Sequence, residues 1–269
     1  MQLRGLFVSV VKNLYNRALP YLMNNQPKII ILSPHIDDAA FGLTLTIEKF
    51  ITNKVPVTII NCFTVTRWTG VFVSRDIEVV SRLRKEEDAE YNKLFNSQIG
   101  IIHLDLLDAP LRNGYIFQNQ PFQQNELELI EDLKKLLEQH ILNGILLCPL
   151  AIGNHIDHVI CREAVVKLYR KFHVIFFEDL PYAQRIGEDQ IHRHIHNLEV
   201  QLGLNLTSLT SRSDNSIIDK YQAIGVYKSQ LNEEICSEIV GHMNALGGER
   251  LWGEDGAIEE FVRVLKPQP

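Results

Sequence analysis

Two short segments of the sequence concentrate side chains that could bind a metal ion and move protons. The first is His35-Ile36-Asp37-Asp38, and the second is His155-Ile156-Asp157-His158. Two imidazoles and a carboxylate on one side of an ion suit Zn²⁺ or Fe²⁺ and leave positions open for water and substrate. A further carboxylate nearby can accept a proton from the bound water, and a further imidazole can stabilise an oxyanion. These residue types therefore fit metal-assisted hydrolysis.

Each segment taken alone has a simpler explanation. Asp37 or Asp38 could cap a helix that starts at Ala39, and a loop histidine is more often hydrogen-bonded or solvated than a metal ligand. The position of both segments in the chain favours a functional site. Each segment follows an apolar run that ends at a proline, Pro34 or Pro149. Strand ends of parallel sheets meet at one edge, where α/β proteins bind ligands.

The chain alternates between patterns typical of strands and of amphipathic helices, which predicts an α/β fold with a doubly wound parallel sheet. After Gln184 this alternation weakens, and the sequence predicts a polar linker over residues 208–215 followed by helices over 217–230 and 233–246. The predicted strands span residues 29–32, 57–63, 100–104, 144–148 and 173–177, and the predicted helices between them span 40–50, 77–95, 124–140 and 159–171.

The composition is that of a globular protein, with 45% hydrophobic and 22% charged residues. A net charge of -6 gives no overall attraction to phosphate backbones and argues against nucleic-acid binding. The four cysteines lack the CxxC spacing of a metal site, and we expect them to be reduced core residues of a cytoplasmic protein. They are Cys62, Cys148, Cys161 and Cys236.

Residues 1–27 are predicted to form an N-terminal amphipathic helix ahead of a single domain over 28–269. Lys12 and Arg17 interrupt its apolar stretch and argue against a signal peptide. We expect the helix to dock on its own domain or on a second subunit of a homo-oligomer, in preference to a membrane surface contacted through residues 1–22. No apolar run is long enough for a transmembrane segment.

The two His/Asp segments, together with the preceding Ser33-Pro34, resemble the motifs of the PIG-L/LmbE-like family of metal-dependent deacetylases. The resemblance extends over about residues 28–252 in the family's order. Its other parts are Phe177-Glu178-Asp179-Leu180-Pro181-Tyr182-Ala183, Lys220-Tyr221-Gln222-Ala223, Tyr227-Lys228-Ser229-Gln230 and Gly248-Glu249-Arg250-Leu251-Trp252.

The resemblance implies a Rossmann-like three-layer sandwich with a mostly parallel sheet and a helical C-terminal region. It also implies a zinc ion, with Fe²⁺ or another divalent metal as alternatives, and removal of the N-acetyl group from an N-acetylglucosaminyl or related amino-sugar substrate. By motif position, the metal ligands would be His35, Asp38 and His158.

The resemblance also assigns catalytic roles. Asp37 would be the general base, and His155 would stabilise the oxyanion or protonate the leaving amine. Asp157 would orient a histidine. The sequence departs from the commonest family pattern at Ile36, Ala39 and Gly153, where many or some members have proline, glutamate and tyrosine respectively. None of these changes removes a ligand or the base, so they bear on the substrate and not on hydrolysis.

Three further residues could contact the substrate. Arg67 and Trp68 follow the second predicted strand and could hold a sugar by hydrogen bonding and stacking, and Arg112 follows the third. A solvated loop arginine beside a packing tryptophan explains the first two equally well.

Two other features receive structural interpretations. Arg84 and Glu87 are predicted to pair within a helix. His192, His194 and His196 are predicted to lie on an exposed strand or loop, in preference to a metal site.

Two alternatives to a deacetylase remain open at this point. A sugar- or metal-binding protein without turnover would have no chemical need for a base beside the ligands. A non-haem iron oxygenase would use a similar set of two histidines and one carboxylate, but its usual scaffold is a β jelly roll, which the alternating pattern does not predict.

Overall fold

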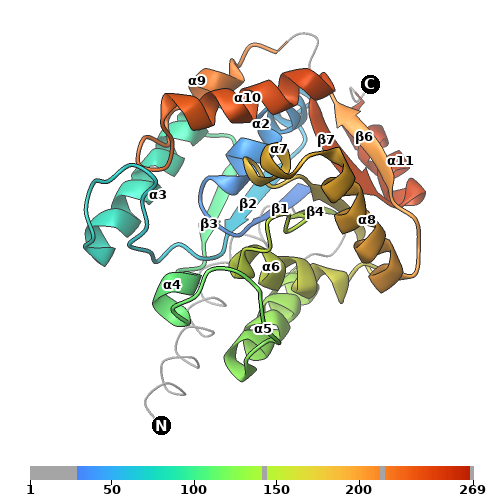
Figure 1. The fold of residues 1–269 in the computed structure, drawn as a ribbon. Helices are drawn as coiled ribbons and strands as arrows, with labels where there is room; N and C mark the ends of the chain where they lie inside the picture. The colour runs from blue at the N-terminus through green and yellow to red at the C-terminus, as the bar shows by residue number, and fades with distance from the viewer. Residues whose placement is uncertain (1–28, 141–143, 213–215, 267–269) are drawn as a thin grey trace.

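The computed structural model describes residues 29–140, 144–212 and 216–266, which form a sheet with helices on both faces (Figure 1). The predicted N-terminal helix lies outside the described residues, so its docking stays a prediction. Among the helices of the described ranges, none is long and apolar enough to cross a bilayer. All four cysteines are buried and unpaired, as expected for core residues.

The sheet has seven strands in the order β3-β2-β1-β4-β5-β7-β6. The first five pair in parallel, and β7 and β6 add an antiparallel edge, so the mostly parallel Rossmann-like prediction is confirmed. The strands are β1 (Ile29–Ser33), β2 (Val57–Asn61), β3 (Gly100–His103), β4 (Ile145–Pro149), β5 (His173–Phe177), β6 (Thr207–Ser211) and β7 (Glu249–Gly253).

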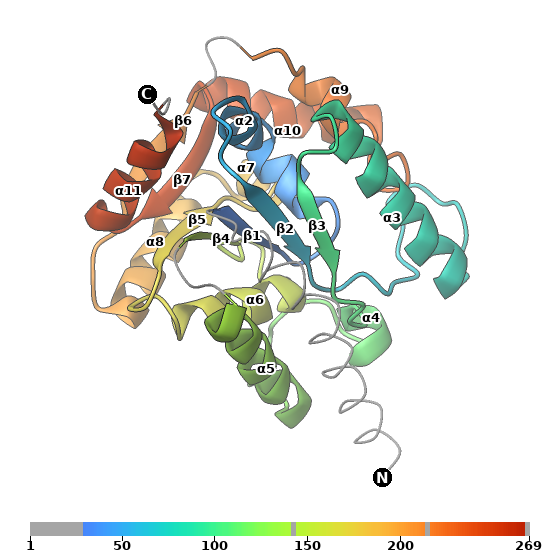
Figure 2. The ribbon, with the colours of Figure 1, turned by 180° about the vertical axis from the view of Figure 1, so that it is seen from behind.

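The helices cover both faces of the sheet. Figures 1 and 2 show α2, α9 and α10 on one side and α5 and α6 on the other. The helices are α2 (Asp38–Thr52), α3 (Ile77–Leu94), α4 (Ala109–Arg112), α5 (Gln124–His140), α6 (Ile156–Val166), α7 (Tyr182–Ile186), α8 (Glu188–Leu202), α9 (Lys220–Ile224), α10 (Glu233–Leu246) and α11 (Asp255–Leu265).

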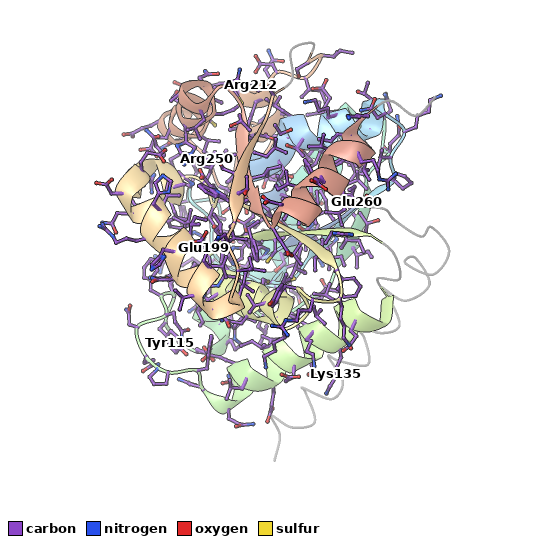
Figure 3. All side chains as sticks on the ribbon, turned by 90° about the vertical axis from the view of Figure 1, so that its right-hand side faces the viewer. Tyr115, Lys135, Glu199, Arg212, Arg250 and Glu260 are labelled. Atoms are coloured by element: carbon purple, nitrogen blue, oxygen red, sulfur yellow. The ribbon has the colours of Figure 1, made fainter. Side chains whose placement is uncertain are left out.

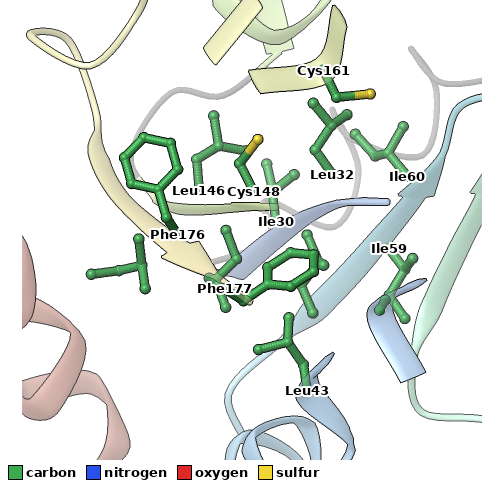
Figure 4. Packing of buried hydrophobic residues seen from close by; sticks show 14 of the residues in the cluster. Ile30, Leu32, Leu43, Ile59, Ile60, Leu146, Cys148, Cys161, Phe176 and Phe177 are labelled. Atoms are coloured by element: carbon green, nitrogen blue, oxygen red, sulfur yellow. The ribbon is translucent and has the colours of Figure 1, made fainter. Parts of the chain in front are cut away.

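The central strands are buried on both faces, which is why they read as continuous apolar runs. Successive side chains alternate between the two faces, so Ile59 and Ile60 of β2 contribute to different sides (Figure 4). Phe176 and Phe177 of β5 divide in the same way, and Leu43 of α2 packs on the Phe177 side. This packing fixes the strand register, because a slip of one residue would exchange the two faces.

The C-terminal part differs from the prediction in two places. Residues 208–211 were expected in a linker but belong to strand β6, which pairs with the unpredicted strand β7. The polar sequence of β6 lacks an apolar alternation because it is an edge strand with exposed residues. The helix expected over 217–230 is limited to α9, whereas α10 agrees with the helix expected over 233–246.

The histidine run was assigned to the wrong kind of element. His192, His194 and His196 lie on helix α8, not on a strand or loop. The periodicity that reveals the helix is apolar, with Ile191, Ile195, Leu198 and Leu202 buried along one face. His192 and His196 are exposed on the other face, one helical turn apart.

Candidate active site

The two His/Asp segments meet at the carboxyl edge of the sheet. β1 and β4 are parallel neighbours, with Ile29, Ile30 and Ile31 aligned against residues 145–147. His35 therefore follows β1 on the same edge at which His155 and His158 follow β4. The structure brings together residues that are more than a hundred positions apart in the chain.

Three polar atoms at this edge form a nearly equilateral triangle. His35 Nδ1 lies 3.2 Å from His158 Nε2, and each of these nitrogens lies 3.3 Å from Asp38 Oδ2. A tetrahedral ion with bonds of about 2.0–2.2 Å places its neighbouring ligands roughly 3.3–3.6 Å apart. The triangle thus has the dimensions of one face of a tetrahedral zinc site.

His155 belongs to the same cluster at a greater distance. One ring nitrogen from each of His35, His155 and His158 lies within 4.8 Å of the others. This looser set of three histidines and the tighter set with Asp38 are alternative ligand groups. We favour the set with Asp38, because its three separations match tetrahedral geometry and the wider histidine spacing does not.

Buried carboxylates hold the outward-facing nitrogens of the two candidate ligands. His35 Nε2 lies 3.1 Å from Asp157 Oδ2, and His158 Nδ1 lies 2.5 Å from Asp179 Oδ1. Such contacts place the ring proton on the nitrogen that faces the carboxylate. The other nitrogen of each ring then presents a lone pair toward the triangle, where Asp38 contributes a third acceptor. Three acceptors that face one point form a site that a cation could occupy.

The two carboxylates are themselves anchored. Asp157 accepts hydrogen bonds from Arg112 Nη2 at 2.7 Å and from the Ala109 backbone N–H at 3.0 Å. Asp179 accepts one from the Ile152 backbone N–H at 2.9 Å. These bonds fix both carboxylates and, through them, the orientation of both imidazoles.

The pKa values show how strongly this cluster favours positive charge. Burial lowers the pKa of His35, but hydrogen bonds and charges from Asp157 and Asp38 outweigh it and raise the value to about 10. Burial raises the pKa of Asp38, and His158 and His35 then lower it well below its usual range. The carboxylates thus stabilise a cation here, whether it is a proton or a metal ion.

His155 has the opposite electrostatic environment. Its pKa is lowered to about 3, first by burial and then by the charge of His35. Its Nδ1 accepts the Asp157 backbone N–H at 3.3 Å, so the proton of the neutral ring is on Nε2. His155 therefore offers an N–H donor to the site near neutral pH.

Asp37 is buried beside the cluster and does not cap the helix. It precedes α2, but its side chain makes no capping hydrogen bond, and Asp38 accepts from the His35 backbone N–H at 2.7 Å. Arg84 Nη2 instead donates to Asp37 Oδ1 at 2.8 Å. The predicted pair between Arg84 and Glu87 is wrong, because the helix turns Arg84 toward Asp37 and Glu87 toward the Ser229 backbone and hydroxyl.

The cluster lies in a cavity of about 440 Å³. Trp68 lines it, but among the described lining residues neither Arg67 nor Arg112 appears. Arg67 is exposed, and Arg112 is held behind the site by Asp157 and by the Leu107 backbone carbonyl. Of the three predicted substrate contacts, only Trp68 is placed to touch a ligand in this cavity.

A comparison with known families identifies the fold family of this chain. The family model PIG-L, described as GlcNAc-PI de-N-acetylase, matches residues 30–169, which is more than half of the sequence. The chain belongs to the PIG-L family. The match covers both His/Asp segments and the strands that position them.

The individual relatives of this chain have low sequence identity to it. The 2'-N-acetylparomamine deacetylase of Streptomyces fradiae is 25% identical over 240 residues, which are 84% of this chain and 81% of the relative. Among solved structures, the A40926 pseudoaglycone deacetylase Dbv21 is similar with a TM-score of 0.60 at 20% identity, covering 84% of this chain and 96% of that one. A deacetylase–teicoplanin complex gives 0.62 at 18% identity, covering 85% and 99%. These structural similarities concern the fold.

Gly153 stands where some PIG-L members have tyrosine, and the structure of this chain explains why glycine is favoured there. Its φ of +85° favours glycine, and a Cβ here would lie 2.7 Å from the Tyr182 ring. Tyr182 lines the cavity, and its ring meets the His158 ring edge to face at 6.2 Å. The ring of Tyr182 therefore occupies the space next to Gly153.

Two supporting residues of this PIG-L site were missed at the level of sequence. Arg84 was assigned to an intrahelical pair, and Asp179 was quoted within a motif without a role. Both act on residues of other segments, since Arg84 bonds Asp37 and Asp179 bonds His158. Asp179 directly follows the sequence Phe177-Glu178 at the end of β5, and its place after a strand on the active edge is the signal that could have found it.

Proposed function

We propose that this protein is a zinc-dependent N-deacetylase that hydrolyses the N-acetyl group of an N-acetylglucosaminyl or related amino-sugar conjugate. The observation that carries the proposal is the triangle of His35, Asp38 and His158 with Asp37 beside it. The similarity of the chain to a 2'-N-acetylparomamine deacetylase and to the A40926 pseudoaglycone deacetylase supports amino-sugar deacetylation. The structure described as a zinc-inhibited teicoplanin deacetylase supports contact between zinc and this fold. The unpaired, buried cysteines are consistent with the cytoplasm as its compartment.

The donor set fits a divalent ion held by His35 Nδ1, His158 Nε2 and Asp38 Oδ2. Zinc accepts such nitrogen and oxygen ligands, and Fe²⁺ is an alternative. When bound, the ion lowers the pKa of water and polarises a carbonyl oxygen. Asp157 and Asp179 keep the two imidazoles oriented toward it.

Asp37 is the proposed general base. Arg84 holds its Oδ1 atom, and Asp37 takes the proton of the attacking water on Oδ2. The guanidinium keeps the carboxylate in place. Attack on the acetamide carbonyl and cleavage of the C–N bond then give acetate and the free amine.

His155 is the proposed oxyanion donor. Its neutral ring carries the proton on Nε2, and it lies in the cavity beside His35, with ring centroids 4.8 Å apart. Donation from Nε2–H stabilises the negative charge that develops on the carbonyl oxygen. The proton collected by Asp37 is available for the departing amine.

The direct test is amine release from a panel of N-acetyl sugars by the purified protein after removal of metal and addition of zinc. We expect Asp37→Asn to lower kcat/KM by about 10²–10⁴-fold, the usual effect of a general base. Zinc content should stay close to that of the wild type, whereas the free energy of unfolding should fall, because Arg84 loses the charge of its buried partner. Asp189→Asn, which changes an exposed aspartate on α8, is the matched control.

Two results would contradict this function. Full activity of Asp37→Asn would remove the proposed base, and absence of amine release from every N-acetyl sugar would favour a binding protein without turnover. A metal-bound crystal structure with ligands other than His35, Asp38 and His158 would overturn the ligand assignment.

A further inference from the structure

Exposed apolar side chains line the catalytic cavity at Trp68 and Phe117 and continue along the chain from Gly70, which also lines it. We define the apolar rim as Trp68, Val71, Phe72 and Val73, from the segment after β2, together with Phe117. Phe72 is 75% exposed, Trp68 57% and Phe117 45%. Single exposed apolar residues need no explanation, but a group of them beside a binding site marks a surface for a partner or ligand.

The segment after β2 is held firmly despite its exposed side chains. The Val71 backbone N–H donates to the Ser229 carbonyl at 3.0 Å, and Glu87 in turn holds Ser229. Gly70 lies so close to Gln230 that a Cβ would come within 2.2 Å of its carbonyl oxygen. The backbone between Trp68 and Phe72 is therefore anchored to residues 229–230.

The rim is continuous with the catalytic cavity. Trp68 and Phe117 line the cavity that has His35, His155 and His158 as its buried polar part. Phe117 is joined to His155 by a backbone bridge, and the two rings are 6.3 Å apart. A substrate whose acetamide reaches the histidines therefore extends outward past these two aromatic rings.

The charges of the cavity do not suit an anionic carrier such as a sugar nucleotide. Among the described lining residues, the cations other than histidine are Arg84 and Arg185. Arg84 is paired with Asp37, and Arg185 donates to Glu238 at 2.7 Å. The walls between them include Leu180, Leu231 and Ile235. The chemistry that matches this surface is apolar.

We propose that the apolar rim binds an apolar aglycone, so that the preferred substrate is an N-acetyl amino sugar joined to an aryl or alkyl group. The inference rests on the proposed deacetylase function and narrows its substrate class. Burial of Trp and Phe rings against an apolar group is favourable, whereas a free sugar leaves the rim exposed to water.

The test compares kcat/KM for free N-acetylglucosamine with that for its phenyl and octyl glycosides. We expect the glycosides to be preferred by roughly tenfold or more, as burial of a small apolar group in a pocket allows. Phe72→Ser and Phe117→Ser should reduce this ratio severalfold. Val200→Ser, which changes a 70% exposed residue on α8, is the control and should leave the ratio unchanged.

A binding measurement separates failure of this inference from failure of the proposed function. Trp68 is exposed and Trp252 is buried, so the fluorescence of Asp37→Asn protein reports ligands at the rim without turnover. Octyl and phenyl glycosides should quench emission at lower concentration than the free sugar, and Trp68→Phe should abolish the response. Lack of all turnover with preferential glycoside binding would contradict the deacetylase function alone.

Other occupants of the rim would overturn the inference. Equal kcat/KM and equal binding for the free sugar and the glycosides would contradict an aglycone site. Sedimentation with vesicles of anionic phospholipid that Phe72→Ser abolishes, combined with such equality, would assign the rim to a membrane surface. A dimer in light scattering that Phe72→Ser dissociates, with the same equality, would assign it to a second copy.

Discussion

Two buried clusters of charged side chains in this protein differ in whether every acceptor has a donor within the protein. Around Glu249 each acceptor oxygen is paired with donors from the protein. Its two carboxylate oxygens accept from the Leu45 and Thr46 backbone N–H groups, the Thr46 hydroxyl and Lys220 Nζ. At the active site, by contrast, His35 Nδ1 and His158 Nε2 face each other at 3.2 Å with Asp38 Oδ2 beside them. One cluster is complete within the protein, and the other is the one that we propose a metal ion completes.

The difference identifies which buried charges hold the fold and which serve chemistry. A buried ion pair with all hydrogen bonds satisfied is typical of a structural network. Glu178 forms a second network of this kind with Arg250, His242 and Trp252. Arg250, which is labelled in Figure 3, extends it to Glu188 of α8. Acceptors directed at one point without a donor are typical of a ligand site.

The largest effect on stability is expected from a substitution that breaks the Glu249 cluster. Glu249→Ala leaves Lys220 buried without its partner and should lower the free energy of unfolding by about 3–5 kcal/mol, measured by urea denaturation. Glu259→Ala, at an exposed position of α11, is the control. The double variant Lys220→Met/Glu249→Leu removes the unpaired charge but leaves the Leu45 and Thr46 donors without this acceptor, so it should recover only part of the loss. A double variant as unstable as Glu249→Ala would contradict the account.

The next effect is a change in zinc affinity caused by loss of the carboxylate that holds a candidate ligand. Asp179→Asn removes the charge behind His158 Nδ1 and should weaken zinc binding by about 10–100-fold, measured by competition with a chelator. Asp219→Asn, at the exposed cap of α9, should leave zinc affinity unchanged. Unchanged affinity in Asp179→Asn would show that His158 needs no support from this carboxylate.

A smaller effect concerns the backbone next to the site. Gly153→Ala places a Cβ at a left-handed φ and against the Tyr182 ring, so it should cost about 1–2 kcal/mol of stability and lower kcat/KM. Gly241→Ala in α10 has open space and a helical backbone, and it should stabilise by about 0.5–1 kcal/mol. Thermal or urea denaturation of both variants checks the two opposite signs.

The smallest effect is the contribution of the Glu178 network to the pH dependence of stability. Burial raises the pKa of Glu178, but hydrogen bonds from His242 and Arg250 outweigh it and leave the pKa below its ordinary value of 4.5. The unfolded chain then binds a proton before the folded protein does, so stability from Glu178 is lost as the pH falls below this value. Unfolding measured across acidic pH should show a shallower decline in Glu178→Gln than in the wild type. Parallel declines would exclude this contribution.

The parallel half of the sheet could be predicted because its residues carry local signals. β1 and β4 are apolar runs that end at Pro34 and Pro149, and their burial on both faces produces that pattern directly. β6 was missed because an exposed edge strand has no such requirement. Helix α8 differs from the prediction because its apolar positions, such as Ile191 and Ile195, are separated by polar residues and histidines and give a weaker local signal than the apolar strands.

The sequence by itself determined the proposed chemical groups of the site, because His35, Asp37 and Asp38 are neighbours at one strand end and His155 and His158 at another. Only the tertiary structure decided what acts on them. Arg84 reaches Asp37 from α3, Arg112 reaches Asp157 from α4, and Asp179 reaches His158 from the loop after β5. The physical reason is that helices and strands have periods that place a side chain on a face, whereas the packing of those faces decides which distant charge it meets.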